Sequence, residues 1–148
     1  MTGKLSLEDH HEISQLYARY GRYVDGGDAD GYIGLFTQDG SFVRTNPIVD
    51  GTGSGLPPAR FEGHEALHKL VKDLAAQFNG KMRHQLTDIF VEPGDHDREA
   101  RGICYGLITD WRDGSGKLSM HGTYRMSIVR TPQGWRFKDV TLARLPAD

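Results

Sequence analysis

The sequence has 148 residues, of which 37% are hydrophobic and 26% charged, and its formal net charge is −2. Length and apolar content of this order predict one folded domain, residues 1–148, that needs no disulfide to fold. The absence of a basic stripe argues against nucleic acid as a partner, and the absence of a run of about 20 apolar residues argues against a membrane span. The single cysteine, Cys104, and the lack of an apolar leader favour a cytoplasmic protein.

The N-terminal part of the sequence has the period of amphipathic helices. Ser6 and Asp9 form a capping-box pattern, and apolar residues then recur at spacings of three and four as far as Val24. Asp28 is expected to cap a second, short helix that extends through Phe36. The sequence TQDG is expected to end this helix before a short strand begins.

A long loop and a third helix are predicted next. Residues 45–60 are rich in Gly and Pro without an apolar period, and we expect them to form a mobile lid at the edge of a pocket. Apolar residues at helical spacing follow Gly63, and the Asn-Gly pair at 79–80 is expected to end that helix.

The C-terminal part of the sequence predicts strands. Segments rich in β-branched and aromatic residues alternate with turns, and they are residues 83–92, 99–112, 118–130 and 134–145. Helices followed by long strands are typical of an α+β fold. We therefore expect three N-terminal helices to cover one face of a strongly curved, mainly antiparallel sheet.

Asp25 stands at an unusual place in the first helix. It lies one helical turn after Gly21, and a glycine inside a helix costs about 1 kcal/mol relative to alanine. With Val24 at the centre of the apolar stripe, a rotation of about 100° per residue puts Asp25 at the edge of that stripe, beside Gly21. An acid next to a gap in the helix surface is a candidate functional group.

The order of the elements resembles the SnoaL-like branch of the nuclear-transport-factor-2-like superfamily. The resemblance extends over nearly the whole chain, and its main signals are YARYGRYVDGGDADGYIGLFTQDGSF and the GHEAL sequence at the start of the third helix. It implies a cone-shaped α+β barrel. The branch includes scytalone dehydratase, bile-acid 7α-dehydratase and hexachlorocyclohexane dehydrochlorinase, which all catalyse eliminations. The superfamily carries many unrelated activities on one fold, so the resemblance implies the fold more directly than the function.

The resemblance also implies a set of catalytic residues. In these enzymes an Asp at the end of the first helix pairs with a His at the start of the first long strand, and the matching residues are Asp25 and His84. Tyr20 matches a tyrosine shortly before the Asp, and Tyr124 of HGTYRM matches one in the third long strand. Arg144 of TLARLP corresponds to an arginine late in the last strand of the bile-acid enzyme.

An Asp–His pair suits proton abstraction from carbon. A carboxylate that accepts a hydrogen bond from one ring nitrogen fixes the tautomer and stabilises the imidazolium, while the other nitrogen takes the proton. Asp25 is expected to orient the ring and His84 to act as the base. Tyr20, Tyr124 and Arg144 are expected to stabilise the charge that develops on the substrate oxygen. The alternative interpretation is a structural pair in the core.

Three further residues are assigned to substrate binding. His121 is the match for a second histidine in the pocket of scytalone dehydratase, and Tyr17 and Phe42 are aromatic residues suited to an apolar pocket wall. Arg44 follows on the same short strand as Phe42 and is able to reach a substrate anion. A surface ion pair explains Arg44 equally well, so it is not included in the catalytic set.

The sequence HEALH at residues 64–68 has the spacing of a zinc site, with two histidines at i and i+4. No third ligand is evident, and the resemblance explains the sequence as a helix start with Glu65 near the positive end of the helix. We therefore expect no metal, and no organic cofactor either, since no glycine loop leads from a strand into a helix in the manner of a phosphate site.

These observations favour a cofactor-free lyase of the dehydratase type, or an isomerase, that acts on a hydrophobic, polyketide- or steroid-like molecule. One alternative is a small-molecule-binding cone without catalysis, and another is a β-type structural subunit of a ring-hydroxylating dioxygenase, which shares this fold. The resemblance implies a homo-oligomer, a trimer or else a dimer. The apolar sequence GICYGLI is a candidate for the contact between its subunits.

Overall fold

The computed structural model describes residues 3–45 and 58–145. Its helices are α1 (Leu7–Gly26), α2 (Ala29–Ile33) and α3 (Gly63–Phe78), and its strands are β1 (Phe36–Thr45), β2 (Ala59–Glu62), β3 (Met82–Pro93), β4 (Glu99–Asp110), β5 (Lys117–Thr131) and β6 (Gly134–Arg144). None of the helices in these two ranges is long and apolar enough to cross a lipid bilayer.

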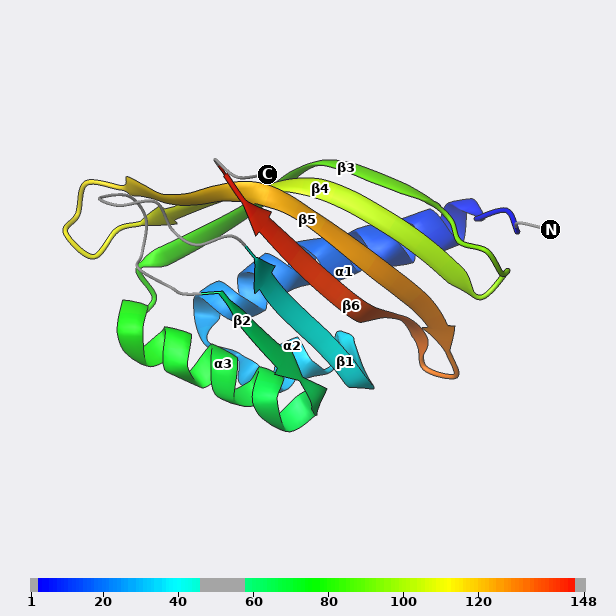
Figure 1. The fold of residues 1–148 in the computed structure, drawn as a ribbon, viewed down its shortest axis with the longest axis horizontal. Helices are drawn as coiled ribbons and strands as arrows, with labels where there is room; N and C mark the ends of the chain where they lie inside the picture. Colours follow the sequence, from blue (N-terminus) through cyan, green and yellow to red (C-terminus); the bar gives the residue numbers. More distant parts are fainter. Residues whose placement is uncertain (1–2, 46–57, 146–148) are drawn as a thin grey trace.

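The strands form one curved sheet in the order β2-β1-β6-β5-β4-β3. Strands β3 to β6 pair antiparallel in succession, while β1 pairs parallel to β6 and antiparallel to β2. In Figure 1, α1 crosses one face of the long strands, and α3 lies beside β1 and β2. The predicted α+β class is confirmed, with three helices on a curved sheet that is mainly antiparallel.

The two long helices begin and end where their local signals predict. Ser6 caps α1 through a reciprocal pair of hydrogen bonds with Asp9, of 2.9 and 3.0 Å. Gly27 follows α1 in the left-handed conformation that favours glycine, and Asn79 does the same after α3. Caps depend on residues a few positions apart, which explains why the sequence locates them well.

The second helix is shorter than predicted. It ends at Ile33, and Phe36 is the first residue of β1, so the TQDG sequence lies within a strand. Phe36 is buried and pairs with Phe137 of β6, and the register then shifts before Ser41. The turn-forming residues are therefore accommodated as an irregularity in the β1–β6 pairing and do not end a helix.

Strand β2 was not expected from the sequence. It has four residues, Ala59–Glu62, and pairs Phe61 with Phe42 of β1. A segment this short has too few positions to show the alternation of a strand. The first two residues of β2 belong to the predicted loop 45–60, and residues 46–57 of that loop lie outside the described ranges, as does the proposed lid.

Asp9 connects α1 to the far end of the sheet. Its carboxylate accepts hydrogen bonds from the Ser6 backbone, from Trp135 Nε1 at 3.0 Å and from Arg130 at 2.6 Å. These bonds, the one from the Ser6 backbone first, hold the pKa of Asp9 well below its ordinary value of 3.8. Asp9 therefore stabilises the fold in its ionised form.

Replacing Asp9 with asparagine is expected to lower the free energy of unfolding by about 1–2 kcal/mol at pH 7. A carboxyl group whose pKa is depressed by folding contributes stability above its unfolded pKa, near 3.8, and loses it as the pH falls toward the folded value. Urea unfolding at a series of pH values should show the two proteins converging below about pH 4. Asp97→Asn is the matched control, because Asp97 is exposed between β3 and β4 and forms no side-chain hydrogen bond or ion pair with the described residues. A difference that stays constant down to pH 2 would contradict this role.

Candidate active site

Asp25 and His84 form a close pair between α1 and β3. The Asp25 carboxylate accepts one hydrogen bond from His84 Nδ1 at 2.7 Å and a second from the His84 backbone N–H at 2.9 Å. The His84 side chain is 9% exposed and that of Asp25 is 13% exposed. One carboxylate therefore fixes both the backbone and the ring of the same histidine.

The position of Asp25 is locally unfavourable for a carboxylate. It lies in the last turn of α1, near the negative end of the helix dipole, where an acid is destabilising by a few tenths of a kcal/mol or more. Gly21, one turn earlier, allows the helix to approach β3, because a Cβ there would come within 3.2 Å of the His84 carbonyl oxygen. The missing side chain at Gly21 and the acid at Asp25 thus have one explanation, which is the contact with His84.

This contact determines the tautomer of His84. An ionised carboxylate only accepts hydrogen bonds, so in the neutral imidazole Nδ1 carries the hydrogen and Nε2 has the lone pair. No residue in the described ranges bonds to Nε2. Because β3 is the edge strand of the sheet, its backbone N–H at His84 is also available to Asp25. The contact with Asp25 therefore holds both the backbone and the ring of His84 in one orientation.

His84 lines a cavity between the helices and the sheet. The cavity has a volume of about 30 Å³, enough for one or two water molecules. In the described ranges its wall is formed by Tyr20, Val24, Tyr32, Phe42, Arg44, Leu70, Val71, Leu74, Met82, His84, Ile108, Ser119, Met120, Tyr124 and Leu142. Most of the wall is apolar, and a few polar groups are placed around it.

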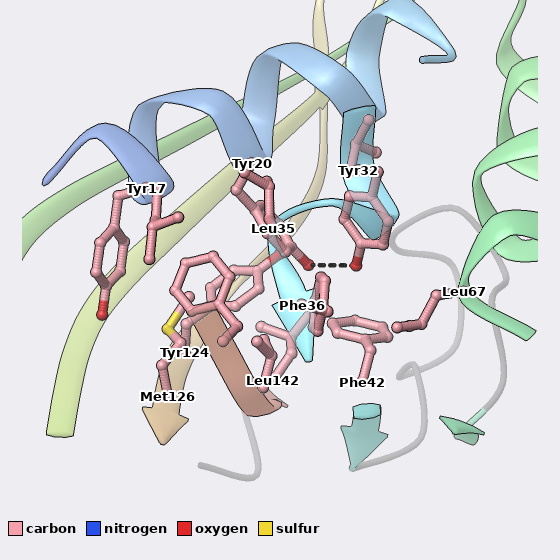
Figure 2. Close-up of a cluster of buried hydrophobic side chains, with 14 of the residues drawn as sticks. Tyr17, Tyr20, Tyr32, Leu35, Phe36, Phe42, Leu67, Tyr124, Met126 and Leu142 are labelled. Carbon is pink, nitrogen blue, oxygen red and sulfur yellow. Dashed lines mark hydrogen bonds between the residues drawn. The ribbon is translucent and has the colours of Figure 1, made fainter. Parts of the chain in front are cut away.

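Three tyrosines bring hydroxyl groups to this cavity. Tyr20 and Tyr124 lie edge to face with centroids 5.8 Å apart, and the Tyr32 hydroxyl donates to that of Tyr20 at 3.4 Å (Figure 2). The Tyr20 ring is also 6.5 Å from the His84 ring. Burial raises the pKa of all three phenols, so each remains a neutral hydrogen-bond donor at neutral pH.

Arg44 belongs to the cavity wall, although it was not included in the predicted catalytic set. It is buried, and its guanidinium lies 5.4 Å from the centroid of Phe61 and 6.0 Å from that of Phe42. Burial and the neighbouring Arg144 lower its pKa. The alternation of side chains along a strand could have identified it, since Arg44 and Phe42 are two residues apart and therefore lie on the same face.

The remaining predicted residues have different positions. Phe42 lines the cavity, whereas Tyr17, His121 and Arg144 are not among the described residues of its wall. Tyr17 is buried nearer the N-terminus of α1, at the other end of the aromatic cluster from Tyr32 (Figure 2). The His121 ring is tilted by 47° against that of Tyr105, with centroids 5.8 Å apart. Arg144 is buried, and its Nε donates to the Thr45 carbonyl oxygen at 3.2 Å.

The two histidines of HEALH are engaged separately. His64 Nε2 lies 3.2 Å from the Phe36 carbonyl oxygen, and His68 Nε2 lies 3.1 Å from an Asp30 carboxylate oxygen. Across residues 3–45 and 58–145, no three His, Cys, Asp or Glu side chains form a group that could hold a metal ion. In the structure these histidines tie α3 to β1 and to α2.

The fold has many structural relatives. An NTF2-like protein with a cystatin-like fold from Novosphingobium aromaticivorans is 26% identical, with a TM-score of 0.80 over 96% of this chain and 85% of that one. Aln2 from a Streptomyces species is 24% identical, with a TM-score of 0.75 over 95% and 94%. A candidate scytalone dehydratase from Novosphingobium aromaticivorans is 17% identical, with a TM-score of 0.68 over 93% and 85%. The last two likenesses show the fold alone.

Among curated proteins, none matches the chain. The sequence pattern of the SnoaL-like domain, in contrast, matches residues 5–141, which is nearly the whole chain. This match and the NTF2-like structural neighbour confirm the resemblance inferred from the sequence. The chain therefore belongs to the SnoaL-like domain family of the NTF2-like superfamily.

Proposed function

We propose that this protein is a cofactor-free lyase of the dehydratase type, or an isomerase, that removes a proton from carbon on a hydrophobic small molecule. The observation that carries the proposal is the 2.7 Å hydrogen bond between Asp25 and Nδ1 of His84, a histidine that lines a largely apolar cavity. In the neutral imidazole this bond leaves the lone pair on Nε2. The likeness to a candidate scytalone dehydratase is in keeping with the proposal.

In the proposed reaction, His84 Nε2 takes the proton from a carbon next to a carbonyl group. The electron pair of the broken C–H bond moves into an enolate, whose oxygen accepts hydrogen bonds from the neutral hydroxyl groups of Tyr20 or Tyr124. In an elimination, the enolate then expels a hydroxide from the β carbon, and the His84 imidazolium returns its proton to form water. In an isomerisation, the proton returns to another carbon instead. Asp25 stabilises the imidazolium in both cases.

Arg44 is a second candidate for oxyanion stabilisation, with stronger support from the structure than Arg144. Arg44 lines the cavity, while Arg144 is not among the described residues of its wall. A buried guanidinium near an enolate oxygen interacts with it more strongly than an exposed one, because less water screens the charges. We therefore assign to Arg44 the role that the sequence suggested for Arg144.

Proton abstraction can be detected before the natural substrate is known. Aromatic and polycyclic β-hydroxy ketones, incubated with the protein in D₂O, are expected to gain deuterium at the α carbon or to lose water, which mass spectrometry detects. His84→Ala protein serves as the control for background exchange. Binding of such compounds without any exchange would favour the alternative of a ligand-binding cone without catalysis.

The outer face of the sheet supports a second proposal, that the protein forms a homo-oligomer. Large apolar side chains are exposed on one face of β3, β4 and β5, and they are Phe90, Ile103, Tyr105 and Leu118. Phe90 pairs with Ile103 across the strands, and Leu118 pairs with Thr109, so the four residues share this face. We assign it to contact with further copies of the chain, in a trimer or else a dimer.

Replacing Phe90, which is 61% exposed, with aspartate is expected to convert the oligomer to monomer, because the charge would be buried without a partner. Multi-angle light scattering at micromolar concentration measures the change. Leu7→Asp is the matched control, since Leu7 is 85% exposed on α1, outside this face. A wild-type protein that is monomeric in this measurement would refute the proposal.

A further inference from the structure

Strand β5 carries an extra residue at Ser119. Met120 pairs with Ile108 of β4 and Leu118 pairs with Thr109, so Ser119 has no partner position on β4. Neighbouring residues of a regular strand point to opposite faces, yet Ser119 and Met120 both line the cavity. A bulge of this kind redirects a side chain and is common beside active sites.

The hydroxyl group of Ser119 is buried without a partner. Ser119 is 6% exposed, and its Oγ makes no hydrogen bond to the residues in the described ranges. Leaving a buried hydroxyl unpaired is destabilising by about 1–3 kcal/mol, and most such groups in native proteins are paired. Its neighbours in the wall, Ile108 and Met120, are apolar. The bulge thus places one unsatisfied polar group in the wall of the cavity.

The pairing of the strands places Ser119 relative to His84. His84 pairs with Ile108, and Ile108 pairs with Met120, the neighbour of Ser119. His84 and Ser119 are therefore two strands apart at nearly the same level, with backbones separated by about 10 Å. Both residues line the same cavity, so a ligand that widens its space of about 30 Å³ to the size of one ring contacts both side chains.

We propose that Ser119 Oγ binds an oxygen atom of the ligand, a hydroxyl or a carbonyl, on the side of the ring away from the carbon that His84 deprotonates. The role of His84 in this statement rests on the proposed function, whereas the hydrogen bond from Ser119 does not. A hydroxyl on the ligand is able to donate and accept, and so satisfies the serine. The ligand class is accordingly an oxygenated cyclic compound, since a hydrocarbon leaves Ser119 unpaired.

Phenol and toluene test this assignment, because they have nearly the same shape and differ in a hydroxyl against a methyl group. Ser119→Ala is expected to weaken phenol binding by about 5- to 10-fold and to leave toluene binding unchanged, as measured by NMR titration of the protein amides. Ser119→Thr keeps the hydroxyl and should keep the affinity for phenol. Ser127→Ala, on the same strand outside the cavity wall, is the matched control and should change neither affinity.

Equal weakening of both probes by Ser119→Ala would show that Ser119 acts through shape alone, and this would overturn the proposal. Unchanged phenol binding in that variant, or no phenol binding by the wild-type protein, would overturn it too. His84→Ala should keep the Ser119-dependent preference for phenol. A wild-type protein with that preference but without deuterium exchange would refute the proposed catalysis and leave the Ser119 site standing.

Discussion

Replacing His84 with alanine is expected to lower the rate of deuterium exchange into a responsive substrate by about 100- to 10,000-fold, the range for loss of a general base. Asp25→Asn should lower the rate to a similar extent for a different reason. An amide in place of the carboxylate is able to donate to Nδ1, which would move the ring hydrogen to Nε2 and remove the lone pair from the cavity. Both changes thus disable the same unit.

The double variant distinguishes a catalytic pair from two independent residues. If Asp25 acts only through His84, the loss in the double variant should be close to that of His84→Ala alone. Ligand binding, followed with phenol, should survive in all three proteins, because the rest of the cavity wall is unchanged. His10→Ala removes an exposed histidine of α1 and serves as the control. If the rate losses of the two single variants multiply in the double variant, or if ligand binding is lost together with activity, the pair is structural.

The parts of the fold that the sequence predicts are those determined by nearby residues. Both ends of α1 follow from its caps, Ser6 and Gly27, and the C-terminal end of α3 follows from Asn79. The start of β1 does not, because Phe36 is held by its pairing with Phe137, about a hundred residues away. Its local sequence indicates a turn, and long-range pairing and burial override that preference.

In the candidate site, too, nearby residues predict some features, and contacts between distant parts of the chain determine the others. Helical rotation puts Asp25 at the edge of the apolar stripe, which does not distinguish a position facing solvent from one facing the sheet. The approach of α1 to β3 at Gly21 decides the matter, and it depends on the tertiary structure. His121 and Tyr124 are three residues apart on β5, so strand parity alone assigns them to opposite faces.

The bulge at Ser119 illustrates a limit of such parity arguments. Counting from Tyr124 would place Ser119 on the outer face of β5, whereas the structure places it in the cavity wall. The extra residue exists only in the pairing of β5 with β4, and no turn-forming residue marks it in the sequence. Polar residues introduced by bulges are therefore found from structures more readily than from sequence patterns.

A second large effect is expected on the stability of the fold when Gly102 of β4 is replaced by alanine. A Cβ added there would overlap the hydroxyl oxygen of Tyr17 and lie 3.1 Å from its Cζ. Tyr17 is fully buried beside Phe137, with ring centroids 5.6 Å apart, and has little room to move. Gly102→Ala is therefore expected to lower the free energy of unfolding by about 3 kcal/mol through overpacking.

Removing the Tyr17 hydroxyl tests whether overlap with it is the reason that Gly102→Ala destabilises the protein. This hydroxyl has no hydrogen-bond partner within residues 3–45 and 58–145, so Tyr17→Phe removes an unsatisfied polar group and should be neutral or slightly stabilising. The same change removes the atom that an alanine at Gly102 would overlap. In the Tyr17→Phe background, Gly102→Ala should then destabilise by about 1–2 kcal/mol less, because residues in contact do not act additively.

Urea unfolding followed by circular dichroism measures the four proteins of this cycle. Gly26→Ala is the control for the substitution itself, since a Cβ at that position meets nothing within 4 Å. If Gly102→Ala lowers the free energy of unfolding equally with tyrosine and with phenylalanine at position 17, then the backbone of β4 requires glycine there, and the tyrosine hydroxyl is not the reason. A smaller loss of unfolding free energy with phenylalanine would show that glycine is required at position 102 by the packing of α1 against β4.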